Sequence, residues 1–201
     1  MDLPDKYKTN FEEGEHEILP NIPGLILNEE IDKEEFKGFF SAQIQFTEGL
    51  TEKTRFNVNY ILDIHKVALK HLYTFAGKYR TVNVSKGGFL FPAAKFLPEI
   101  MNTFESEFLS NLPDKYDDTE ILIKDVAKIH AELLFIHPFR EGNGRVARLL
   151  ADLMVLKAGY NYLSLEELRT NRFKEYIYAV QMAANKDYSL MEKLIGESFE
   201  I

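Results

Sequence analysis

Apolar and polar positions recur along most of this chain with the spacing of an amphipathic α-helix. Residues 119–136 show it most clearly, with apolar side chains at Ile121, Ile123, Val126, Ile129, Leu133, Leu134 and Ile136. Asp, Lys and Glu fill the positions between them, which matches one face of a helix rather than strand alternation. Pro138 disfavours the α conformation at His137, so we predict that this helix ends about at the histidine.

Further segments carry the same helical periodicity. They are residues 27–50 (one helix or a helix pair), 54–76 (ended by Gly77), 94–109, 145–159, 172–185 and 189–199. Ser164, followed by Glu166 and Glu167, is typical of a helix N-cap with acids in the first turn. In residues 81–92, by contrast, β-forming residues flank Gly87-Gly88, which is a strong hairpin signal. The predicted fold is mainly α, with one small β-hairpin.

Length and composition predict one compact domain preceded by a short arm. Residues 1–24 are polar and contain Pro4, Pro20 and Pro23, so we expect an irregular arm there. The remaining residues, 25–201, are expected to form a single domain, because 201 residues with 45% apolar content can bury an adequate core. The chain has no cysteine, which excludes disulfides and thiolate metal sites.

Charge excludes some partners. The chain carries 24 basic and 32 acidic side chains, a net charge of −8, so neither nucleic acid nor an anionic membrane would be drawn to its surface in general. Its first residues lack the pattern of a secretory signal, and no apolar run approaches the length of a membrane span. We therefore expect a cytoplasmic protein.

The chemistry is concentrated in residues 137–148, which read HPFREGNGRVAR. Gly142 and Gly144 can adopt positive φ and bring backbone N–H groups close to a ligand. Because a helix is predicted to follow, this turn would form an anion cradle at a helix N-terminus. Arg145 and Arg148, three residues apart, can converge on one polyphosphate. Glu141 would repel phosphate if bare, and fits as a ligand for Mg²⁺ on phosphate oxygens.

A structural role has to be weighed for each part of this segment. A single histidine before a proline usually makes a helix-end hydrogen bond, and a single Gly-Asn-Gly is usually a turn. Their combination with two arginines reverses that preference and favours phosphoryl or nucleotidyl transfer with His137 as proton acceptor. The other histidines show no ligand spacing with carboxylates and are predicted to be surface or core residues: His16, His65, His71 and His130.

Residues 137–148 match every fixed position of the signature His-x-Phe-x-(Asp/Glu)-Gly-Asn-Gly-Arg-x-x-Arg, so the chain resembles the Fic family. The likeness extends over about residues 62–195. It includes Ile64-His65-Lys66, the segments 72–80 and 83–91 that look like the family's core helix and flap hairpin, and Arg172, Tyr176, Ala179 and Asp187-Tyr188 further on. The resemblance therefore implies a Fic-type helical domain with a β-hairpin flap.

The resemblance also implies an activity, the transfer of AMP from Mg²⁺-ATP to a hydroxyl group of a target protein. By motif position His137 would be the general base and Glu141 would hold Mg²⁺. The phosphates would be bound by N–H and amide groups of Gly142, Asn143 and Gly144, by Arg145 and Arg148, and by Lys86 at the flap. Tyr176 is a candidate wall of the adenine pocket, although an aromatic at helical spacing is more often a core residue.

Partners and regulation follow from the same resemblance. The hairpin from Lys86 to Phe91 would dock the target protein through its free edge, the alternative being that it merely covers the core. Many Fic proteins are inhibited by a glutamate that pairs with the last motif arginine. Here Glu48 acting on Arg148 within the chain is the weaker option, and we favour a separate inhibitory partner, as in toxin–antitoxin pairs.

Two alternatives to AMP transfer stay open at this point. The first is a regulatory binding partner that keeps the nucleotide cradle without catalysis, against which the intact His137 and Glu141 argue. The second is the same site used as a phosphotransferase or as a hydrolase that removes AMP. The intact Gly-Asn-Gly-Arg favours AMP over phosphate transfer, because the kinase branch of the superfamily departs from that pattern.

Overall fold

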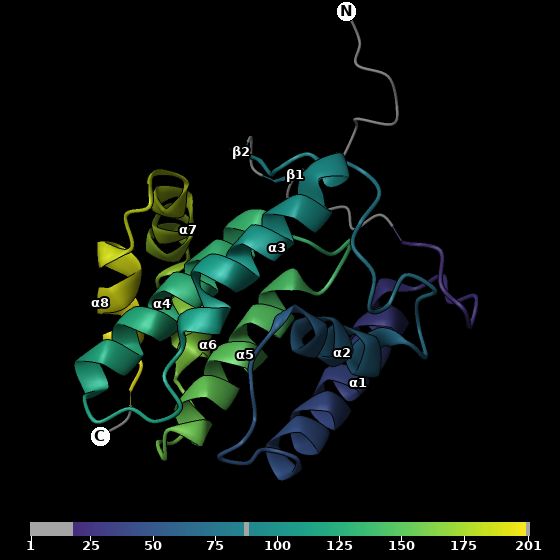
Figure 1. Cartoon of the computed structure of the whole chain (residues 1–201). Helices are drawn as coiled ribbons and strands as arrows, with labels where there is room; N and C mark the ends of the chain where they lie inside the picture. The colour runs from purple at the N-terminus through teal and green to yellow at the C-terminus, as the bar shows by residue number, and fades with distance from the viewer. Residues whose placement is uncertain (1–17, 87–88, 200–201) are drawn as a thin grey trace, which may run out of the picture.

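The computed structural model describes residues 18–86 and 89–199, and this part of the chain is a helical assembly with one hairpin (Figure 1). The helices are α1 (Asn28–Glu48), α2 (Val58–Leu69), α3 (Leu97–Glu107), α4 (Thr119–Ile136), α5 (Asn143–Lys157), α6 (Leu165–Thr170), α7 (Phe173–Met182) and α8 (Ser189–Glu197). Short 3-10 turns lie at Ala94–Phe96, Leu109–Asn111 and Ala183–Asn185. The prediction of a mainly α fold with one hairpin is confirmed.

Helix α4 lies at the centre. It packs against α5, α7 and α8, while α1 and α2 pair with each other on the other side of α5 (Figure 1). Its buried residues lie on nearly every side of the helix, among them Leu122, Val126, Ala127, Ile129, Ala131, Leu133 and Ile136. Glu120 and Lys124 are exposed near its start, so the second half of α4 is the part that lies in the interior. The loop between α4 and α5 is thereby carried on the two best-buried helices of the fold.

The boundaries of α4 agree with the prediction at both ends. Asp118 caps its first turn by accepting the Glu120 N–H at 2.8 Å, and the helix ends at Ile136 with His137 as the C-cap residue. The helix predicted over residues 54–76 is shorter, Val58–Leu69, because Asn57 caps it by accepting the Tyr60 N–H at 2.8 Å. The prediction that Gly77 ends this helix is wrong, because the helix ends at Leu69 and Gly77 lies in the turn that follows, with φ +74°.

The hairpin is a minimal one. Strands β1 (Ser85–Lys86) and β2 (Phe89–Leu90) pair antiparallel, with Ser85 opposite Leu90 and Lys86 opposite Phe89. Gly87-Gly88, on which the hairpin prediction rests, lies outside the described residues. Residues 18–24 are irregular, as predicted for the arm, whose first 17 residues also lie outside the described part. Among the described residues, no helix is both long and apolar enough to cross a bilayer.

Candidate active site

The loop joining α4 to α5 turns sharply through two left-handed residues. His137 ends α4 with φ 52° and ψ 58°, and Gly142 precedes α5 with φ 81°. Pro138 explains why the right-handed helix ends at His137, although its steric effect favours an extended rather than a left-handed residue there. The second left-handed residue is a glycine, which tolerates positive φ without cost. The loop thus places the histidine and the N-terminus of α5 on the same side of the fold.

Asn143 holds this loop closed. Its Oδ1 accepts the Phe139 N–H at 2.8 Å and its Nδ2 donates to the Phe139 carbonyl at 2.8 Å. The side chain is buried. Nδ2 carries two hydrogens and the bond to the Phe139 carbonyl uses one, so the prediction that the Asn143 amide donates to phosphate stays a prediction. The backbone N–H groups at the helix N-terminus are further donors for phosphate.

Arg80 ties the loop to the hairpin. Its backbone N–H donates to the Pro138 carbonyl and its Nε to the His137 carbonyl, each at 2.8 Å. Its two terminal nitrogens donate to the carbonyls of Val82 and Pro92, which flank the hairpin, at 2.8 and 2.6 Å. Burial, with the charge of Arg140, lowers the pKa of Arg80 to about 10, so it stays charged near neutral pH. One buried cation therefore sets the hairpin's position relative to His137.

His65 of α2 supports the motif loop through a hydrogen bond and a ring contact. Its Nδ1 accepts the Gly77 N–H at 2.8 Å, which leaves Nε2–H to donate to the Glu141 carbonyl at 3.0 Å. The ring stacks on Phe139 with centroids 3.9 Å apart. Burial lowers the pKa of His65 to about 4, so the neutral form persists. His65, for which the sequence left a surface or a core position open, is a core histidine.

His137 is held in one tautomer. Its Nδ1–H donates to the Leu134 carbonyl at 3.2 Å, which leaves the lone pair on Nε2. Nε2 has no partner among the described residues, and the Phe91 ring stacks on the imidazole with centroids 4.0 Å apart. Burial, followed by the charges of Arg80 and Lys86, lowers the pKa of His137 to about 4. The imidazole is therefore neutral at pH 7, as a proton acceptor must be.

Glu141 was predicted to hold Mg²⁺. Its Oε1 accepts the Gly142 N–H at 2.7 Å and an N–H of Arg145 at 3.2 Å, while Oε2 has no partner among the described residues. No cluster of three or more ligating residues exists in the described part of the chain. A single part-exposed carboxylate suits Mg²⁺ shared with substrate phosphates, because that ion retains waters and needs few protein ligands. Glu141 is compatible with that role.

The two motif arginines lie in the first turns of α5, and their side chains make different contacts. Arg145 forms ion pairs with Glu35 of α1 and with Glu141, and lies over the Phe39 ring with its Cζ 4.6 Å from the centroid. Arg148 folds back toward Gly144, where a Cβ would meet its Nη1 at 3.3 Å. The structure therefore brings together His137, Lys86, Glu141, the Gly142–Gly144 turn, Arg145 and Arg148.

Residues 55–155, half of the chain and including all of these groups except Glu35 and Phe39, match the Fic/DOC family. The chain belongs to the Fic/DOC family. A protein named "Protein adenylyltransferase Fic" from Nematostella vectensis is 34% identical over 140 residues, which are 68% of this chain and 30% of that protein. The namesake from Aedes aegypti is 29% identical over 168 residues, 83% of this chain and 32% of that protein. This chain thus spans about a third of these relatives.

Solved structures share the Fic fold at low sequence identity. The N-terminal Fic domain of a VirB-translocated effector from Bartonella quintana superposes with a TM-score of 0.74 at 16% identity, over 96% of this chain and 92% of that one. BepC from Bartonella tribocorum, whose structure has AMPPNP bound, gives a TM-score of 0.72 at 15% identity, over 98% and 97%. These likenesses show that the fold extends over nearly all of the chain.

One predicted Fic-site residue is buried. Tyr176 of α7 is 6% exposed, and its hydroxyl lies 2.5 Å from Nε2 of His130, which is itself fully buried and contacts the Ala147 carbonyl through Nδ1. Burial raises the pKa of Tyr176 to about 12, so it remains a phenol. Tyr176 joins α7 to α4 and also contacts the side chain of the motif residue Arg148. Its assignment to the wall of the adenine pocket stays a prediction.

The cis inhibition option is at odds with the Fic domain's geometry. Glu48 is the last residue of α1 and is exposed, whereas Glu35 of the same helix reaches the site. At a rise of about 1.5 Å per residue, the two glutamates lie about 20 Å apart along the axis. Glu48 therefore lies at the opposite end of α1 from Glu35, which pairs with Arg145 of the motif.

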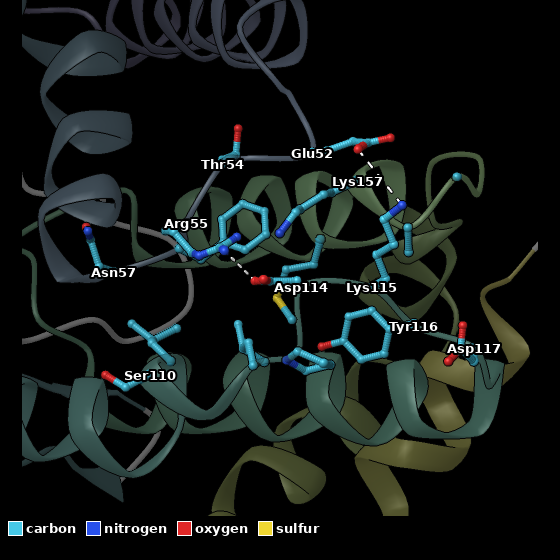
Figure 2. Close-up of a pocket in the computed structure, with 17 residues that line it drawn as sticks. Glu52, Thr54, Arg55, Asn57, Ser110, Asp114, Lys115, Tyr116, Asp117 and Lys157 are labelled. Carbon is cyan, nitrogen blue, oxygen red and sulfur yellow. Dashed lines mark ion pairs between the residues drawn. The ribbon is translucent and has the colours of Figure 1, made fainter.

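A cavity of about 650 Å³ lies at the C-terminal end of α5, the opposite end from the Fic motif. Figure 2 shows two ion pairs among its lining residues, Arg55 with Asp114 at 2.5 Å and Lys115 with Glu52 at 4.0 Å. Lys157 lies over the Phe56 ring, 5.8 Å from its centroid. Since four of its charged groups already pair with one another and it lies at the other end of α5, the cavity does not compete with the motif loop as the candidate active site.

Sequence reasoning missed two contributors to the site, Glu35 and Phe39 of α1. Both lie outside the residues that match the Fic/DOC family. One signal was available: Glu35 occupies the buried face of α1 together with Ile31, Gly38 and Ala42. A glutamate on the apolar face of a helix is rarely buried without a partner. The sequence was nevertheless interpreted with Glu35 exposed, which the structure shows to be wrong, and nothing local identifies its arginine partner.

Proposed function

We propose that this chain is a protein adenylyltransferase that transfers AMP from Mg²⁺-ATP to a hydroxyl group of a target protein. The observation that carries the proposal is the state of His137, a neutral imidazole with its Nδ1–H bonded to a backbone carbonyl and its Nε2 available. Curated relatives named protein adenylyltransferase and membership of the Fic/DOC family support the same activity.

In this proposal the Nε2 of His137 takes the proton of the target hydroxyl as its oxygen attacks the α-phosphorus. The bond to the β-phosphate oxygen breaks, and pyrophosphate leaves. The N–H groups at the start of α5 bind phosphate oxygens, and Arg145 and Arg148 pair with the outer phosphates. Mg²⁺ would be held by Glu141 and would neutralise phosphate charge when bound. Lys86, whose charge lies near His137, would contact the nucleotide.

The hairpin is the proposed docking edge for the target protein. Phe91 is buried against His137, while Leu90 is 71% exposed on the neighbouring position. An extended segment that pairs with the hairpin would therefore be carried close to the imidazole, and main-chain pairing demands little of its sequence. For regulation we retain the proposal of a separate inhibitory partner, since Glu48 lies at the far end of α1.

Incubation with ATP labelled separately at the α and γ positions tests the proposal. We expect α label on protein and none from the γ position, and we expect the α label to disappear in His137→Ala. The matched control is His71→Ala, which removes a half-exposed histidine that bonds the Glu34 carbonyl at 3.2 Å on the α1–α2 side. Label from the γ position would indicate a phosphotransferase, and α label that survives in His137→Ala would refute the assignment of the base.

A further inference from the structure

The guanidinium of Arg145 is held by residues of α1. Glu35 forms an ion pair with Nη2 through its Oε2, and the Phe39 ring lies 4.6 Å from Cζ. Phe39 also supports the turn before α5, because a Cβ built on Gly142 would meet its ring at 3.1 Å. One face of α1 therefore contacts both the first motif arginine and the glycine that starts the cradle.

Glu35 is itself fixed from behind. It is 5% exposed, and its Oε1 accepts the hydroxyl of Tyr73 at 2.7 Å. Burial, followed by the bond to Glu35 and its charge, raises the pKa of Tyr73, so the phenol remains a donor. A buried carboxylate is costly unless it is paired and hydrogen-bonded, and Glu35 has both kinds of partner. The Glu35–Tyr73 hydrogen bond thus joins α1 to the segment that follows α2.

In this geometry Glu35 supports Arg145 and does not occupy the place where phosphate would bind. Glu35 and Glu141 both contact Nη2 of Arg145, so the Nε–Nη1 edge has no protein partner among residues 18–86 and 89–199. The arginine side chain is 29% exposed, whereas that of Glu35 is 7% exposed. An arginine fixed at one nitrogen and one face loses less side-chain freedom when an anion binds its remaining edge.

We propose that Glu35 is a positioning residue that, backed by Tyr73 and flanked by Phe39, pre-orients Arg145 for the outer phosphates of a nucleoside triphosphate. The inference rests on the proposed function in one respect, that the cradle binds a triphosphate. It makes α1, outside the matched residues 55–155, a working part of the nucleotide site. Removing the carboxylate should weaken the binding of outer phosphates and leave a monophosphate unaffected.

The test is calorimetric binding of a non-hydrolysable ATP analogue and of AMP, each with Mg²⁺, to the full chain and its variants. In Glu35→Ala we expect affinity for the triphosphate to fall by about tenfold, the size of one charge-assisted interaction, and affinity for AMP to stay unchanged. Glu35→Gln should lie between, because its amide can still accept from Tyr73 without the ion pair. Glu34→Ala is the matched control on α1, since Glu34 pairs with Lys37 and not with the motif.

Three outcomes would overturn the inference. Equal triphosphate affinity in Glu35→Ala and wild type would show that the carboxylate does not position Arg145. An equal loss for AMP would indicate general distortion, and tighter triphosphate binding would identify Glu35 as a competitor of phosphate. Where Glu35→Ala fails to fold, Glu35→Gln carries the same comparison. The failure of the proposed function gives a different result: the wild-type chain itself would bind no triphosphate, and the inference would fall with it.

Discussion

Gly38 of α1 lies directly against the backbone carbonyl of Ala68 in α2, so close that a Cβ on Gly38 would be 1.9 Å from the carbonyl oxygen. The same Cβ would lie 2.6 Å from the His71 ring. No other residue type fits this contact, because real Cβ atoms do not approach so closely. The glycine sits between Glu35 and Phe39 along α1, so this close approach is what brings both of them to the motif loop.

Replacing Gly38 with Ala should therefore force α1 away from α2. We expect a loss of about 3 kcal/mol or more in the free energy of unfolding, since the obstructing atoms are backbone and cannot rotate away. Urea unfolding followed by circular dichroism measures it. The matched control is Gly196→Ala in α8, where a Cβ would meet only Ile123 side-chain atoms at 3.7 and 3.8 Å. That variant should gain about 0.5–1 kcal/mol from helix propensity. Similar values for both would contradict the packing argument.

The motif loop was open to prediction because its parts are contiguous in the sequence. The apolar periodicity of residues 119–136 predicted α4, and Pro138 predicted its end at His137. Both signals are local in the sequence. Glu35 and Arg145 are 110 residues apart, so no local pattern pairs them. The loop contacts of Asn143 were beyond prediction for a related reason: an amide that suits phosphate equally suits the two backbone groups of Phe139, and only the closed loop shows that Asn143 meets them.

Tyr176 and the end of α2 illustrate the same limit. Periodicity places Tyr176 on a helix face but does not say which residues meet that face, and the contact with His130 of α4 is visible only in the fold. The helix predicted to Ala76 stops at Leu69, although the sequence continues with apolar residues. There Tyr73 turns inward to bond Glu35, a tertiary contact that outweighs helix propensity.

Asn143→Ala should destabilise the loop rather than merely weaken phosphate binding. It would leave the buried N–H and carbonyl of Phe139 without partners, at a cost of about 2–4 kcal/mol in the free energy of unfolding. Denaturant melts of the nucleotide-free protein measure this. Asn102→Ala, an exposed position on α3, is the matched control and should change stability by less than about 0.5 kcal/mol. Equal stability of the two variants would show that the Asn143 side chain does not stabilise the loop.

Arg80→Lys should loosen the hairpin from the motif loop while keeping the positive charge. Lysine has one terminal nitrogen and cannot replace the fork that reaches His137, Val82 and Pro92 together. We expect faster amide hydrogen exchange in residues 82–92 and at the start of α5. Arg55→Lys, at an exposed ion pair with Asp114, should leave exchange there unchanged. Unaltered protection in Arg80→Lys would mean that the hairpin is held by other contacts.

The pKa of His137 predicts an unusual pH profile for the proposed reaction. The imidazole acts in its neutral form, and with a pKa of about 4 that form persists well below the ordinary value near 6.5. The ratio kcat/KM, which reports the free enzyme, should stay flat from pH 8 to about pH 5.5. Initial rates of AMP transfer at fixed Mg²⁺ and ionic strength would measure it. A decline centred near pH 6.5 would show that the ring titrates normally and that burial does not control it.

Three histidines, His65 and His130 in the core and the half-buried His137, also make folding stability depend on pH. Burial lowers each pKa to about 4, so below pH 6.5 the unfolded chain takes up protons that the folded chain refuses. Stability is therefore fully present above pH 6.5 and is lost as the pH falls toward 4. With three such groups the free energy of unfolding should fall by about 4 kcal/mol per pH unit between pH 6 and 5.

Urea titrations at half-unit steps measure this slope, and His130→Gln should reduce it by about a third. A slope equivalent to less than one proton would mean that these rings are protonated in the folded protein, and the tautomers that hold the motif loop would then be wrong.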